Sequence, residues 1–223
     1  MRILKYFFLL LVTLTGSCTI TQPILFPASA EVSETTYIEG RGLNGVVLLD
    51  VNWGRYWGCG SFENAQLLSL AFDKMPVIDY SNQAMPSLVL QSPSRLLAEP
   101  IYQTYAFSLP AGEFAISGVS IKVAESMSKV GYYTALRDKL FNIDGQPVGG
   151  TFEVNADEAV FIGSFYLDCT YEPILWRYYP NGREAFESHM EEYRSRYPFL
   201  DLNSIKFRLF ETKEFGQSYE VGK

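Results

Sequence analysis

The chain has 223 residues, a formal net charge of −7 and a single histidine, and 48% of its residues are hydrophobic. An acidic chain with no block of basic residues repels phosphate backbones, so nucleic acid is excluded as an expected partner. A basic membrane-binding patch is excluded for the same reason, and any membrane association is expected to come from a covalent lipid.

The first 18 residues, MRILKYFFLLLVTLTGSC, have the layout of an export signal. Arg2 and Lys5 give a positive start, and the apolar run that follows is shorter than the roughly 20 residues that span a bilayer. Small residues and then a cysteine resemble a bacterial lipoprotein signal, which implies cleavage before Cys18 and a lipid on its thiol. The sequence therefore predicts a signal peptide over residues 1–17 and membrane attachment through Cys18, facing the periplasm from the outer membrane if the cell has one.

A second cleavage site remains open. Ala28, Ser29 and Ala30 have the small-x-small form of ordinary secretory cleavage. Processing there would release a periplasmic or secreted chain that begins at Glu31. Cleavage before Cys18 removes two cationic residues and takes the net charge from −7 to −9.

The chain has three cysteines. If Cys18 carries lipid, Cys59 and Cys169 remain in an oxidising compartment, and we predict a disulfide between them. The alternative is two buried thiols that pack as small hydrophobes. No CxxC or clustered Cys/His spacing occurs, so we predict neither a metal site nor a cofactor.

The segment over residues 18–42 mixes Thr, Ser, Pro and Glu and is predicted to be a lipid anchor and tether. The folded domain is expected over residues 43–215, with a tail over 216–223. Within it, short runs of partial period-2 alternation lie between Gly, Pro and Asn, a pattern typical of strands. The predicted strands cover residues 45–53, 65–73, 87–91, 102–109, 113–123, 151–154, 159–167 and 203–211.

One late segment has helical periodicity. In residues 183–197, Phe186, Met190, Tyr193 and Tyr197 recur at spacings of four, three and four, which predicts an amphipathic helix with one core-facing stripe. About eight strands and this helix predict a mainly β fold, an antiparallel β-sandwich with the helix packed on an edge or a face.

Two stretches resemble known families. Residues 109–114 (LPAGEF) resemble the LPAG-x-[Tyr/Phe] strand entry of prealbumin-like β-sandwich modules. Residues 149–154 (GGTFEV) and 158–163 (EAVFIG) resemble a hairpin of an uncharacterised group of bacterial lipoproteins, in which glycine usually stands at the position of Asp157. Residues 183–200 resemble that group's acidic helix and the YP-x-L segment after it. The resemblance covers about residues 104–205 and implies a fold and a location but no chemistry.

The candidate binding residues lie in residues 52–62 (NWGRYWGCGSF). Trp53, Tyr56 and Trp57 are surrounded by glycines, and exposed aromatic rings on such a loop can stack on sugars or accept a partner's apolar anchor. In the alternative, Trp53 ends a strand in the core and Trp57 packs on the Cys59–Cys169 bridge. A second aromatic run at residues 176–179 (WRYY) can pack beside the first.

These patterns favour a non-enzymatic envelope lipoprotein that binds a partner protein or a cell-wall glycan, and no catalytic residue is assigned. The sole histidine, His189, is interpreted as a boundary residue of the helix, because triads and zinc sites need a nucleophile or further ligands nearby. The alternative is a secreted or anchored hydrolase that uses paired carboxylates. Its candidate acids are Asp144, Asp157, Glu158 and Asp168.

Overall fold

The computed structural model describes residues 26–93, 102–179, 182–208 and 210–212. The predicted signal peptide, Cys18 and the tail over residues 216–223 lie outside them. In chain order the elements are α1 (Glu34–Glu39), β1 (Asn44–Asn52), β2 (Arg55–Cys59), β3 (Phe62–Lys74), β4 (Leu88–Gln91), β5 (Tyr102–Pro110), β6 (Gly112–Ser126), β7 (Lys129–Ala135), α2 (Arg137–Leu140), β8 (Gly150–Val154), β9 (Ala159–Asp168), β10 (Ile174–Tyr178), α3 (Gly182–Arg196), a 3-10 turn (Leu202–Ser204), β11 (Lys206–Phe207) and β12 (Glu211–Thr212).

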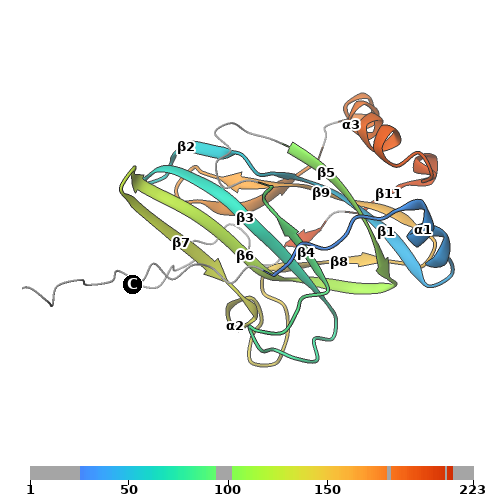
Figure 1. Cartoon of the computed structure of the whole chain (residues 1–223), viewed down its shortest axis with the longest axis horizontal. Coiled ribbons are helices and arrows are strands. Elements are labelled where there is room, and N and C mark those ends of the chain that lie inside the picture. Colours follow the sequence, from blue (N-terminus) through green and yellow to red (C-terminus); the bar gives the residue numbers. More distant parts are fainter. Residues whose placement is uncertain (1–25, 94–101, 180–181, 209, 213–223) are drawn as a thin grey trace, which may run out of the picture.

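The strands form two sheets, which confirms the predicted mainly β sandwich with one late helix (Figure 1). Sheet A has the order β10-β9-β1-β5, and β11 also pairs with β9. Sheet B has the order β12-β8-β6-β3-β2, with β4 on β3 and β7 on β6. The predicted antiparallel arrangement is corrected in sheet A, where β9 runs parallel to β1 and to β11. Sheet A is therefore mixed.

Both faces of β1 are buried. Val47, Leu49 and Val51 point into the inner core between the two sheets. Val46 and Leu48 point the other way, into an outer core formed with α3. Figure 1 shows α3 outside the sheets, on the far side of sheet A from sheet B. A strand covered on both faces needs a nearly continuous apolar run, which is what residues 45–51 supply.

Helix α3 matches its predicted range of residues 183–197 within one residue. Met190, Tyr193 and Tyr197 are buried in the outer core, and Phe186 packs against it while partly exposed. The stripe spaced at four, three and four residues therefore faces sheet A, and the amphipathic prediction is confirmed.

The folded domain begins earlier than the sequence predicts. The backbone N–H of Ser29 donates to the carbonyl of Val89 in β4 at 2.8 Å, and that of Val32 donates to Ala106 in β5 at 2.8 Å. Val32 is buried in the outer core, and Ser33 caps α1. The tether prediction is thus corrected over residues 26–42, because the backbone N–H groups of Ser29 and Val32 and the Val32 side chain have partners in the sandwich and residues 34–39 form α1.

Two other predictions fail locally. Residues 203–211 are not one strand but part of the 3-10 turn and the two short strands β11 and β12. Strand β2 forms where the sequence predicts a glycine-rich loop, and β7 and β10 are not predicted at all.

Asp157 adopts a left-handed backbone with φ 59°, a conformation that glycine favours and aspartate tolerates. Its carboxylate accepts from the backbone N–H of Gly42 at 2.8 Å.

Candidate functional site

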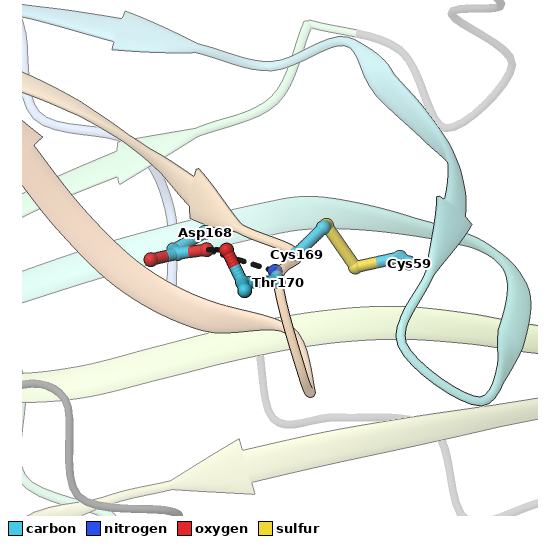
Figure 2. Close-up of a disulfide and its surroundings, with 4 residues drawn as sticks. All are labelled: Cys59, Asp168, Cys169 and Thr170. Carbon is cyan, nitrogen blue, oxygen red and sulfur yellow. Dashed lines mark hydrogen bonds between the residues drawn. A yellow bond between two sulfur atoms is a disulfide. The ribbon is translucent and has the colours of Figure 1, made fainter.

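The predicted disulfide between Cys59 and Cys169 is present, with the sulfur atoms 2.01 Å apart (Figure 2). Cys59 ends β2 in sheet B, and Cys169 follows β9 in sheet A, so the bond joins the two sheets covalently. A turn in which the Asp168 carboxylate accepts from the backbone N–H of Thr170 at 2.9 Å lies beside it.

The predicted aromatic contact surface is corrected at Trp53. This side chain is fully buried, and its Nε1–H donates to the hydroxyl of Tyr105 at 2.7 Å. It lies in the inner core because it directly follows β1. This agrees with the alternative in which Trp53 ends a strand in the core. Tyr56 is half-buried against the same core, whereas Trp57 is 58% exposed with the Arg55 guanidinium 5.4 Å from its ring centre. Of the three predicted residues, only Trp57 presents a mostly exposed ring.

Three tyrosines from three strands form a second aromatic group, which we call the tyrosine surface: Tyr102 of β5, Tyr166 of β9 and Tyr178 of β10. The ring centres of Tyr102 and Tyr178 lie 6.2 Å apart and those of Tyr166 and Tyr178 lie 5.7 Å apart, both edge to face. Strand register places Tyr102 opposite Asn52 and Tyr178 opposite Ser164, on the face of sheet A that α3 covers further along. Tyr102 is 48% and Tyr178 is 38% exposed.

The hydroxyls of Tyr166 and Tyr178 stay protonated at neutral pH. Burial, followed by the neighbouring Tyr102, raises the pKa of Tyr178 to about 12. Burial also raises the pKa of Tyr166, with Asp168 and Tyr102 as further causes. Burial, and then Tyr102, raises the pKa of Tyr56 as well. The group therefore combines flat apolar rings with hydrogen-bond donors.

A buried carboxylate lies beside the tyrosine surface. Asp50 of β1 is almost fully buried, and its Oδ2 accepts from the Ser164 hydroxyl at 2.7 Å. The Tyr193 hydroxyl of α3 donates to its Oδ1, and Nε2 of His189 lies 2.6 Å from Oδ2. Burial, and then Asp50, raises the pKa of Tyr193 well above its usual value. Ser164 stands opposite Tyr178 in the register, so it links Asp50 to the tyrosine surface.

This polar group holds α3 on sheet A. Ser164 and Tyr193 both donate to Asp50 and not to His189, so the residues do not form the nucleophile–base–acid chain of a triad. His189 is partly exposed, as a boundary residue should be, but its contact with Asp50 is a feature that sequence reasoning missed. A signal for it exists: Asp50 is the only charged residue in the apolar run at residues 45–53, and a buried charge needs partners.

Three of the four candidate acids of the alternative hydrolase make structural contacts with their carboxylates. The Glu158 carboxylate accepts hydrogen bonds from Arg208 Nη1 at 2.7 Å and from Lys206 Nζ at 2.8 Å. Asp157 accepts from the backbone N–H of Gly42, and Asp168 accepts from that of Thr170 in its own turn. Asp144 lies in the exposed turn at residues 142–145. These contacts are structural and give a paired-carboxylate mechanism no support.

Among the described residues, no group of three or more His, Cys, Asp or Glu side chains is arranged to hold a metal ion. No helix in the same ranges is both long and apolar enough to cross a membrane. Comparison with known proteins found no matching family model, no matching curated protein and no matching solved structure.

Proposed function

We propose that this protein is an exported envelope lipoprotein, tethered through Cys18, whose β-sandwich binds a partner protein of the envelope through the tyrosine surface. The binding role is non-enzymatic. The observation that carries this proposal is the contact between the half-exposed rings of Tyr102 and Tyr178 on sheet A. The disulfide joins this sheet to sheet B.

Two features support export with cleavage before Cys18. A disulfide between the sheets suits an oxidising compartment. The segment before Ala30 is also part of the fold: the Ser29 hydroxyl accepts from the N–H of Val89 at 2.9 Å, and the carbonyl of Phe26 accepts from the Gln91 side chain. Cleavage after Ala30 would remove both contacts, whereas cleavage before Cys18 keeps them.

Composition supports a protein partner. Tyrosine, tryptophan and arginine dominate the hot spots of protein interfaces, because each offers a large contact area together with polar atoms. The tyrosine surface is accompanied by Trp176, on the same strand as Tyr178, whose ring centre lies 5.9 Å from the guanidinium of Arg177. The guanidinium of Arg55 lies over the ring of Trp57 in the same way.

The proposal is tested by placing a photoreactive phenylalanine analogue at position 102 in the native host and, as a control, at position 127. Met127 is 97% exposed in the turn between β6 and β7. We expect one discrete protein adduct at position 102, absent at position 127 and strongly reduced by Tyr178→Ser. An adduct with glycan would replace the protein partner by a cell-wall glycan. Equal labelling at both positions, or no adduct, would contradict a binding role for this surface.

A further inference from the structure

Two loops beside α2 carry exposed apolar side chains, which we call the apolar tip: Ile78, Met85 and Ile143. Ile78 and Ile143 are fully exposed, and Met85 is 55% exposed. The two loops lie together, because the Tyr80 hydroxyl of the first donates to the carbonyl of Gly145 in the second at 3.2 Å. Single exposed apolar residues are ordinary, but a group gathered from two loops marks a contact surface.

The first of these loops is held in place by a buried ion pair. Arg137 of α2 binds Asp73 at the end of β3, with Nε 2.6 Å from Oδ2. Its Nη1 donates to the carbonyls of Ser81 and Ala84, each at 2.8 Å. Arg137 thus fixes the loop that carries Ile78 and Met85, so their exposure is built into the fold.

The first described residues lie at this end of the domain. Phe26 lines a small pocket on sheet B together with Pro86, Leu136 and Arg137, the last of which anchors the loop of the apolar tip. In Figure 1 the dark blue start of the described chain lies beside β4, near the loops around α2, while β2 and the β6–β7 turn lie at the other end of sheet B. Cys18 precedes Phe26 by eight residues, and a chain of that length reaches at most about 28 Å.

We infer that the apolar tip rests on the lipid surface to which Cys18 is anchored and forms a second membrane contact. The inference depends on the proposed lipid anchor, which keeps this end of the domain close to the bilayer. Asp79, Asp138 and Asp144 in the same loops and in α2 outnumber the exposed Lys139 of α2, so the contact suits zwitterionic headgroups better than anionic ones. Trp57, in β2 at the other end of sheet B, then faces away from the membrane.

Two methionines serve as built-in probes. The purified lipidated protein is reconstituted into phosphatidylcholine vesicles and treated with hydrogen peroxide, which converts exposed methionine to its sulfoxide. Peptide mass spectrometry then gives the oxidation rates of Met85 and Met127 and the acylation state of Cys18. The comparison variant carries Ile78→Ser and Ile143→Ser, which remove exposed side chains and leave Arg137 and Asp73 in place.

We expect the ratio of the Met85 oxidation rate to the Met127 oxidation rate to be at least threefold lower in the vesicle-bound wild type than in the vesicle-bound double variant. Acylated Cys18 with the same Met85-to-Met127 ratio in both proteins would overturn the membrane contact and leave the anchor standing. Absence of acyl mass on Cys18 would overturn the anchor and this inference with it.

Discussion

Asp50 of β1 and His189 of α3 meet between sheet A and the helix that covers it, with Oδ2 and Nε2 2.6 Å apart. The two residues are 139 positions apart in a chain that has only one histidine. The carboxylate also accepts hydrogen bonds from the hydroxyls of Ser164 and Tyr193, so β1, β9 and α3 converge on one buried carboxylate. Such a charge stabilises the docked helix only while its partners stay in place.

Replacing Asp50 by alanine is expected to lower the free energy of unfolding by about 2–4 kcal/mol, because it leaves the Ser164 and Tyr193 hydroxyls buried without an acceptor. Urea unfolding followed by circular dichroism measures this change. Asp144→Ala, in an exposed turn, serves as the matched control and is expected to stay within about 0.5 kcal/mol of the wild type. Similar values for the two variants would contradict a role for Asp50 in holding α3.

Truncation of the two tryptophans in the region around β2 should lower the free energy of unfolding by very different amounts. Trp53→Ala is expected to cost about 3–5 kcal/mol, since it opens a cavity in the inner core and removes the donor to Tyr105. Trp57→Ala is expected to cost less than about 1 kcal/mol, since that ring is mostly exposed. Denaturant midpoints of the two variants provide the measurement, and the reverse order would contradict the assigned positions.

Stability should fall in acid through Glu158. Burial alone would raise the pKa of this carboxyl group, but hydrogen bonds from Arg208, Lys206 and Asn155 outweigh burial and lower the pKa to about 2. A carboxylate with a lowered pKa stabilises the fold above its unfolded pKa, near 4.5, and loses that contribution as the pH falls through about 2. The loss is at most about 3 kcal/mol, and the partial exposure of Lys206 and Arg208 reduces it further.

The matched variant for this pH dependence is Glu158→Gln, which keeps the shape of the side chain and removes its titration. Urea unfolding of both proteins between pH about 5 and about 2 is the measurement. The wild type should lose stability more steeply than the variant across this window. Parallel curves would show that Glu158 is not the group responsible.

Opening the disulfide should be costly because it closes a loop of 110 residues. In the chain-entropy model a loop of this length contributes about 4–5 kcal/mol. The double variant Cys59→Ala and Cys169→Ala should therefore unfold at a clearly lower denaturant concentration, while Cys18→Ala alone should not shift the midpoint. A double variant as stable as the wild type would contradict a stabilising role for the bond.

Local patterns were sufficient for much of the fold. Helix α3 follows from the spacing of Met190, Tyr193 and Tyr197, and most long strands follow from alternation and β-branched content. The short pieces β11 and β12 do not follow, because residues 203–211 alternate like one strand, and only tertiary contacts show that the chain divides between the two sheets. The early start of the domain is hidden for the same reason: Ser29 and Val32 are stabilised by β4 and β5, far along the chain.

The candidate site was predictable only in part. Once Cys18 is set aside for the predicted lipid, the cysteine count leaves only Cys59 and Cys169 to pair, and they do. The aromatic character of residues 53–57 is plain in the sequence. Which ring is buried depends on strand geometry, and Trp53 and Trp57 differ because one follows β1 into the core and the other lies on β2 with its ring outward. The contact between Tyr102 and Tyr178 requires the strand order of sheet A, which no local pattern specifies.

The most direct test of the lipoprotein account is the intact mass of the mature protein, extracted with detergent from its native host, beside that of a Cys18→Ala variant. We expect a wild-type chain that begins at Cys18 and carries added acyl mass, and no such mass in the variant. A wild-type chain that begins at Glu31 without lipid would contradict the anchor and would also show that the domain tolerates loss of the segment bound to β4.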